Sequence, residues 1–156
     1  MNQTEKKLDA IMNYLGAQDD ESRAKSFDVL LNMASNKPNP SAALEEVISQ
    51  ELTQLGVPCH IIGHRYLAMA VKIAVLDPTA VHMIVKKLYA DTAKACDTTP
   101  SRAERAIRHA IELCWDRGDW DDLHDYFGNT ISKMKGKPTN SEFIAKVSDT
   151  IRRKMA

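Results

Sequence analysis

Apolar residues recur along the chain with the three- and four-residue spacing that predicts amphipathic α-helices. Stripes of this kind run through five stretches, residues 8–15, 24–34, 44–55, 63–76 and 81–88. Glycine and proline fall at the joints between the stripes, at Gly16, the K-P-N-P run of 37–40, Gly56 and Asp77-Pro78. No stretch alternates with the two-residue period of a strand. The pattern therefore predicts an all-α fold.

Residues 89–118 have the order of a helix-turn-helix motif. A short helix is predicted over 90–96, and Asp97 stands where the tight turn needs a residue that tolerates a left-handed backbone. The second helix, about 100–117, has two candidate starts. Thr99 caps it with Pro100 at the first helical position, or Ser101 caps it and forms a capping box with Glu104. The sequence leaves both open.

A helical wheel of about 100° per residue divides the second helix into two faces. The core face is apolar or small, with Ala103, Ala106, Ile107, Ala110, Ile111 and Cys114. The opposite face is polar, with Ser101, Arg102, Glu104, Arg105, Arg108, His109 and Glu112. Arginines near a helix start suit the major groove, because the guanidinium fork matches the acceptors of guanine. The alternative is a solvated face with pairs such as Glu104–Arg108.

Residues 1–40 are predicted to form a helical hairpin and a stiff linker, followed by a larger helical domain over 41–156. A two-helix hairpin is too small to be stable alone, so its apolar stripes must pack on the larger domain, on a second copy or on another protein. We favour a homodimer as a hypothesis, because helix-turn-helix proteins read paired half-sites as dimers.

The chain carries 21 basic and 21 acidic residues, which excludes a polybasic protein but allows a local basic surface. Residues 133–156 hold seven of the basic residues against Glu142 and Asp149. No apolar run approaches the roughly 20 residues of a membrane span, and the first residues lack the apolar core of a secretory signal. Three widely spaced cysteines do not form a disulfide framework. We expect a cytosolic protein that makes no membrane contact.

Several motifs together resemble the C-terminal DNA-binding effector domain of the master response regulator of sporulation initiation, the stage zero sporulation protein A family. They are L-G-V-P-C-H-I-I-G-H-R-Y-L, T-T-P-S-R-A-E-R-A-I-R-H-A-I-E, W-D-R-G, F-G-N-T and K-G-K-P-T-N-S-E-F-I-A. The resemblance runs from about Leu44 to the last helix. It implies a six-helix effector domain that binds TGTCGAA-type boxes in double-stranded DNA and regulates transcription in the bacterial cytoplasm, associated with the nucleoid.

The resemblance also implies roles for individual residues. The S-R-x-E-R motif places base contacts on Arg102, Glu104 and Arg105. Phosphate contacts are expected next to this motif, at Ser101, Arg108 and His109. The segment after the second helix is expected to contact the sigma factor of RNA polymerase.

The loop before the last helix is a separate candidate, which the residues themselves suggest. Lys133, Lys135 and Lys137 have the charge to meet DNA phosphates, and a solvated loop is the alternative. Thr139 and Glu142 form a T-x-x-E motif that predicts the start of the last helix.

Two features depart from the family pattern. Forty residues cannot build the five-stranded receiver domain of such regulators, so we expect no control by aspartyl phosphorylation. Residues 116–125 are more acidic than the family leads us to expect, which weakens the expected sigma-factor contact. The acidic segment favours an alternative function, in which the protein antagonises the full-length regulator or another partner without reading DNA.

Other candidate sites carry less weight. Cys59, His60 and His64 are interrupted by Pro58 and Gly63 and lack a fourth ligand, so neither a metal nor another cofactor is expected. Trp115 and Trp120 are expected to pack in the core or between helices, and residues 152–154 are expected to be a frayed tail. No catalytic motif appears in a convincing context, so an enzyme is not expected.

Overall fold

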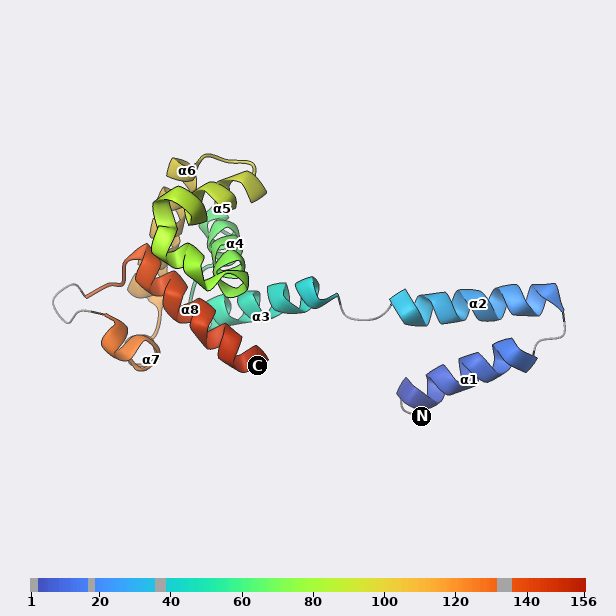
Figure 1. Cartoon of the computed structure of the whole chain (residues 1–156). Coiled ribbons are helices and arrows are strands. Elements are labelled where there is room, and N and C mark those ends of the chain that lie inside the picture. Colours follow the sequence, from blue (N-terminus) through green and yellow to red (C-terminus); the bar gives the residue numbers. More distant parts are fainter. Residues whose placement is uncertain (1–2, 17–18, 36–38, 132–135) are drawn as a thin grey trace. The chain divides into compact units, whose positions relative to one another are not determined.

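The computed structural model describes residues 3–16, 19–35, 39–131 and 136–156, and the chain divides into two compact units, Met1–Pro40 and Ser41–Ala156. Every regular element in these residues is helical (Figure 1). The prediction of an all-α fold is confirmed. In the part of the chain so described, no helix combines the length and the apolar character needed to cross a bilayer.

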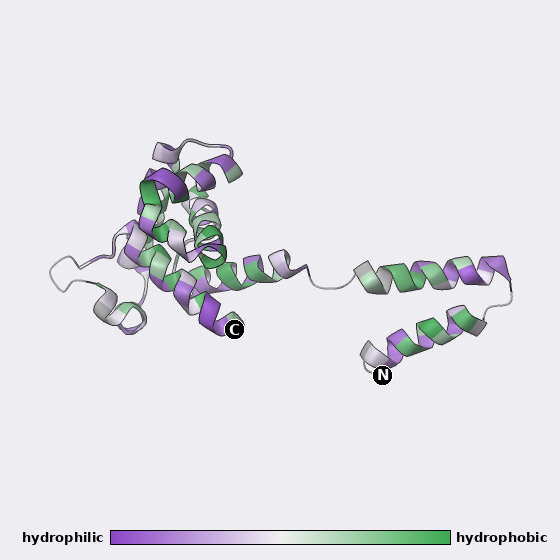
Figure 2. Ribbon diagram, in the orientation of Figure 1, coloured by the Kyte–Doolittle hydropathy of each residue, from purple (hydrophilic) through white to green (hydrophobic). Residues whose placement is uncertain are grey.

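The first unit is a hairpin of α1 (Gln3–Gly16) and α2 (Asp20–Ser35). Asp19 begins α2 by accepting hydrogen bonds from the backbone N–H (2.7 Å) and the hydroxyl (2.9 Å) of Ser22. Ala10 is buried, and the rings of Tyr14 and Phe27 lie 6.3 Å apart. Both helices carry hydrophobic and hydrophilic stretches along their length (Figure 2).

The described residues of the second unit contain six α-helices, as expected for the effector domain. They are α3 (Pro40–Gln54), α4 (Ile62–Leu76), α5 (Tyr89–Ala95), α6 (Pro100–Arg117), α7 (Trp120–Phe127) and α8 (Asn140–Met155). Helix α4 contacts both α6 and α8 (Figure 1). Its fully buried residues Leu67 and Val71 belong to the same core as Ile107 of α6 and Phe143 of α8.

Helices α4 and α6 approach closely at Gly63. A Cβ atom placed on this glycine would lie 2.3 Å from the carbonyl oxygen of Ala106 and 2.9 Å from the Cβ atom of Ala110. Only a residue without a side chain allows this crossing. Because α4 packs at the same time on α8, the position of α6 is fixed from its buried side.

The connection between α4 and α5 differs from the prediction. The stripe over 81–88 is a 3₁₀-helix (Pro78–Met83) followed by a π-helix (Ile84–Leu88) rather than an α-helix. The 3₁₀-helix begins at Asp77, whose carboxylate accepts from the backbone N–H of Thr79 (3.1 Å) and pairs with Lys87. Neither helix type keeps the 3.6-residue register. As a result Val85, which was assigned to the stripe, is 71% exposed.

Helix α8 begins with the predicted T-x-x-E motif. The side chain of Thr139 accepts from the backbone of Glu142, and that of Glu142 accepts from the backbone of Thr139, which forms a capping box. The prediction of a frayed C-terminus is wrong. Helix α8 continues to Met155, Arg152 donates to the carbonyl of Ala74 (3.1 Å), and the ammonium of Lys154 lies 2.5 Å from the buried carboxylate of Glu51.

Candidate nucleic-acid interface

Helices α5 and α6 follow one another in the order, and with the turn chemistry, of a helix-turn-helix motif. Asp97 has a φ of 53°, the left-handed conformation that was predicted for the turn. The backbone N–H of Thr98 donates to the carbonyl of Ala93 (2.9 Å), which closes the end of α5. Ala93 is almost fully buried, so α6 can lie close to α5.

The start of α6 is capped by Thr99. Its hydroxyl accepts from the backbone N–H of Arg102 (3.3 Å), its own backbone is extended, and Pro100 occupies the first turn. Ser101 is helical and exposed and does not serve as the cap. Of the two starts that the sequence allowed, the structure therefore has the Thr99–Pro100 start. It leaves the hydroxyl of Ser101 at the outer surface of the first turn.

The two faces of α6 are confirmed. Every residue assigned to the core face is buried except Ala106, which is half-buried. On the outer face Arg102, Glu104, Arg105 and His109 are exposed. Among the described residues, none of the side chains of Arg102, Arg105 and His109 has a hydrogen bond or ion pair. The donors of both guanidinium groups are therefore available to a ligand.

Arg108 differs from the two arginines before it. Its Nε donates to the carboxylate of Glu112 (3.0 Å) and its Nη1 donates to the carbonyl oxygen of Pro138 (2.9 Å). The side chain is half-exposed, and its carboxylate partner is Glu112 rather than the Glu104 considered from the sequence. Arg108 thus ties the middle of α6 to the segment that leads into α8.

The predicted lysine contacts lie in the loop before α8. Lys137 forms an ion pair with Asp116 near the end of α6 (2.8 Å). Lys133 and Lys135 lie outside the described residues. Together with Arg108, Lys137 holds the beginning of α8 beside α6.

Two further residues near the motif were not singled out from the sequence. Asn140 is buried and its Nδ2 donates to the hydroxyl of Tyr89 (2.9 Å) and to the carbonyl of Glu104 (3.3 Å), so one side chain joins α8 to both helices of the motif. Arg65 of α4 is exposed. Burial raises the pKa of Cys96 in the turn, and the positive charge of Arg65 offsets part of this rise. Residue spacing carries no signal for either contact, since the partners come from other elements.

The segment after α6 presents an acidic surface. Asp119 begins α7 by accepting from the backbone N–H groups of Asp121 (3.0 Å) and Asp122 (3.1 Å). Trp115 packs edge-to-face on Phe127, as expected, with ring centroids 5.4 Å apart. The prediction that Trp120 is packed is wrong, because this side chain, at the first position of α7, is 60% exposed.

The remaining candidate groups lack a reactive arrangement. The thiol of Cys114 donates to the carbonyl of Leu55 (3.0 Å), and burial raises its pKa to about 12, which leaves it protonated. Cys59 and His60 are exposed, and burial lowers the pKa of His64. In the described ranges, no three His, Cys, Asp or Glu side chains are arranged to hold a metal ion.

A helical domain that offers unpaired arginines on the outer face of the second helix of such a motif belongs to the class of DNA-binding transcription regulators. The family described as the sporulation initiation factor Spo0A C terminal matches residues 48–151 of this chain. The chain belongs to this family and carries a DNA-binding domain of sporulation regulators. The match includes all of α4 to α7 and ends within α8, whereas the hairpin of α1 and α2 lies outside it.

Proposed function

We propose that the protein is a sequence-specific regulator of transcription that inserts α6 into the major groove of double-stranded DNA. The observation that carries this proposal is the unpaired state of Arg102 and Arg105 on a helix whose other face is anchored in the core. Each guanidinium has the donors to bind O6 and N7 of a guanine, and the exposed carboxylate of Glu104 suits the amino group of cytosine. Boxes of the TGTCGAA type contain both bases.

Contacts to the DNA backbone would surround these base contacts. Ser101 and His109 are exposed on either side of the arginine pair, and Arg108 has donors beyond the two that Glu112 and Pro138 occupy. We assign Lys133, Lys135 and Lys137 to the same role on their sequence position, with Lys137 leaving its exposed partner Asp116 when a phosphate competes. Each such contact adds affinity without adding sequence information and makes binding salt-dependent.

The surface of α7 suits a protein rather than DNA. Trp120, Asp121, Asp122 and Asp125 are exposed there, and their carboxylates would repel phosphates. Tryptophan is enriched at protein interfaces, so the exposed Trp120 is the residue of this surface that points to a protein partner. We propose that this surface contacts a protein partner, and it is also the surface that an antagonist acting without DNA would use.

The decisive experiment compares Arg105→Ala with Arg117→Ala. Both changes remove one exposed arginine from α6, and Arg117 stands about 18 Å further along the helix axis. Binding is measured by mobility shift on a TGTCGAA duplex, on duplexes with single base changes and on a scrambled duplex, at two salt concentrations. Arg105→Ala should weaken box binding by about 1–3 kcal/mol, roughly 5- to 150-fold, and relax the preference at one base pair.

Arg117→Ala should leave the base preference as in the wild type. If Arg105→Ala also leaves it unchanged, the assignment of Arg105 as a base contact is wrong. If the wild-type protein binds box and scrambled duplexes equally at both salt concentrations, sequence-specific reading is wrong and the protein-binding alternative gains support.

A further inference from the structure

The hairpin presents an apolar surface that the other described residues of its own unit leave largely exposed. Four large side chains of α1 recur at i, i+3, i+4 and i+7 and are 44–69% exposed, namely Leu8, Ile11, Met12 and Leu15. We call this set the α1 stripe. Monomeric soluble proteins expose large apolar residues singly rather than in such rows, so a contiguous row marks an interaction surface.

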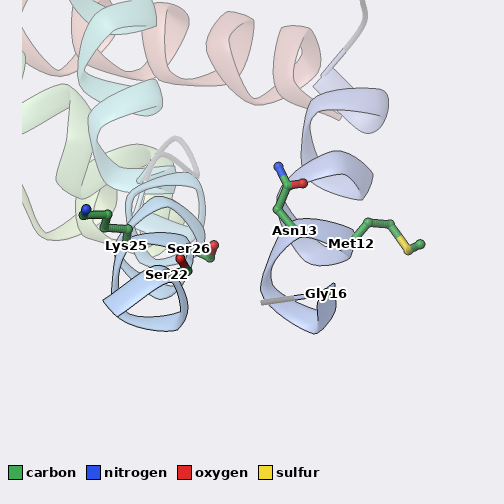
Figure 3. A pocket seen from close by; sticks show the side chains of 6 residues that line it. All are labelled: Met12, Asn13, Gly16, Ser22, Lys25 and Ser26. Carbon is green, nitrogen blue, oxygen red and sulfur yellow. The ribbon is translucent and has the colours of Figure 1, made fainter. Parts of the chain in front are cut away.

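The α1 stripe faces away from α2. Asn13, Ser22 and Ser26 lie along the space between the two helices, and Met12 is directed away from α2 (Figure 3). The aromatic contact between the helices is made by Tyr14 and Phe27, neither of which belongs to the stripe. Ala10, on the inner side of α1, is only 6% exposed. The hairpin therefore leaves much of the α1 stripe exposed, and the full burial of the stripe requires a further partner.

We propose that the partner is a second copy of this chain, with the two α1 stripes packed against each other across a twofold axis. The i, i+3, i+4, i+7 spacing is the pattern by which two identical helices interlock. The positions that flank the α1 stripe carry both signs of charge, with Lys7 basic and Glu5 and Asp9 acidic. Two copies that pack through the stripe therefore do not bring together flanks of like charge alone. A twofold interface uses the same patch on both chains, which is the simplest way to cover a single unpartnered stripe.

The area of the stripe indicates a weak dimer. Four half-exposed large side chains present on the order of 400 Å² of apolar surface per copy, within the range of the largest patches on soluble proteins. Two such patches bury on the order of 800 Å² before neighbouring residues are counted, below the roughly 1,200 Å² at which stable interfaces begin. We therefore infer a monomer–dimer equilibrium in the micromolar range, which adjacent DNA boxes would draw toward the dimer.

The inference deepens the proposed function, since it supplies the pairing of effector domains that two half-sites require. It places the pairing in α1, which lies outside the matched family domain. The exposed stripe itself does not depend on DNA binding, so the two proposals can fail separately.

The test uses the full chain and a double variant, Leu8→Lys with Leu15→Lys. Both side chains are more than half exposed, so the hairpin loses no internal contact. The control is Asp28→Lys, which adds the same two units of charge to an exposed position of α2, away from the α1 stripe. Sedimentation equilibrium across the micromolar range should give a mass rising from 17.4 kDa toward twice that value for the wild type and the control. The double variant should stay at the monomer mass.

Two further measurements on the same samples keep the outcomes distinct. Both tryptophans, Trp115 and Trp120, lie in the second unit, so an unchanged fluorescence unfolding midpoint shows that the effector domain is intact. Binding to a single-box duplex should be equal in all three proteins, whereas cooperative binding to adjacent boxes should be lost in the double variant. A single-box failure in the wild type contradicts the proposed function and leaves the mass result standing.

Three results would overturn the α1 dimer. A wild-type chain that stays at 17.4 kDa at every concentration has its stripe covered by its own effector domain or by another protein. A double variant that still dimerises has its interface elsewhere. A control that becomes monomeric shows that added charge, rather than loss of the stripe, separates the copies.

Discussion

Replacing Gly63 with alanine is expected to push α4 and α6 apart. A Cβ atom at this position would lie 2.3 Å from the carbonyl oxygen of Ala106, whereas ordinary contacts of this kind begin at 3.4 Å. Both atoms belong to the backbone of packed helices or are fixed to it, so no side-chain rotation relieves the overlap. The helices must therefore separate by about 1 Å along the line of contact.

The magnitude follows from two opposing effects. Overpacking of this kind costs about 1–3 kcal/mol, and the upper end applies because the obstacle is a backbone carbonyl. Alanine regains up to about 1 kcal/mol over glycine in a helix. We expect Gly63→Ala to lower the free energy of unfolding by about 2 kcal/mol, which corresponds to roughly 8 °C in Tm for a domain of this size.

Urea unfolding followed by tryptophan fluorescence measures this change, because Trp115 and Trp120 both report on the second unit. The matched control is Gly16→Ala at the end of α1, where an added Cβ atom meets nothing within 4 Å. The control should leave the fluorescence midpoint unchanged. Gly63→Ala should also weaken box binding below its unfolding temperature, since α6 is displaced on its supporting helix. A wild-type midpoint for Gly63→Ala would refute the close crossing of α4 and α6.

Three further predictions concern the anchoring of the second unit. Thr139→Ala removes the capping box of α8 and should lower the free energy of unfolding by about 1 kcal/mol. Thr139→Ser keeps the hydroxyl group and should retain most of this stabilisation. Equal urea midpoints for the two variants would contradict the capping role. Lys154→Ala leaves the buried carboxylate of Glu51 without its cation and should lower the free energy of unfolding by about 1–2 kcal/mol. Arg153→Ala removes an exposed ion pair and should lower it by less than about 0.5 kcal/mol. A larger loss for Arg153→Ala than for Lys154→Ala would contradict this reasoning. Burial lowers the pKa of His64 from its ordinary value of 6.5. Below pH 6.5 the unfolded chain therefore binds a proton at this residue more readily than the folded chain. The stability that is present above pH 6.5 is then lost as the pH falls. His64→Gln should flatten this part of the urea-midpoint profile, and an unchanged profile would exclude His64 as the cause.

The helix-turn-helix segment could be predicted in detail because its signals are local. Asp97 marks the left-handed turn position, and the period of α6 separates core from surface without knowledge of any partner. The sequence narrows the helix start to two neighbouring caps, Thr99 and Ser101, of which the structure has Thr99. Local signals also identified the capping box of Thr139. Each of these features is decided by residues within one helical turn of one another, where propensity and hydrogen-bonding chemistry act directly.

Features that depend on distant partners could not be predicted. Val85 was assigned to a buried stripe on the assumption of a 3.6-residue period, which the 3₁₀- and π-helical turns do not keep. Trp120 was expected to be packed because large aromatic residues usually are, but the sequence does not show that α7 turns this position outward. Lys154 was assigned to a frayed end because its partner, Glu51, lies 103 residues earlier in the chain.

The three arginines of α6 show how tertiary structure divides residues that the sequence treats alike. Arg102, Arg105 and Arg108 recur every third residue on one face, and the wheel gives no reason to separate them. The segment before α8 reaches α6 at the level of Arg108 and takes up two of its donors, whereas no described group reaches the two arginines nearer the helix start. Of these three arginines, only Arg102 and Arg105, in the first two turns of α6, therefore keep all of their donors available. Under the proposed function, a duplex that meets the start of α6 would contact Arg102 and Arg105 first, with Arg108 already bonded behind them. A change at Arg108 should therefore affect stability together with DNA affinity, whereas a change at Arg105 should affect affinity alone.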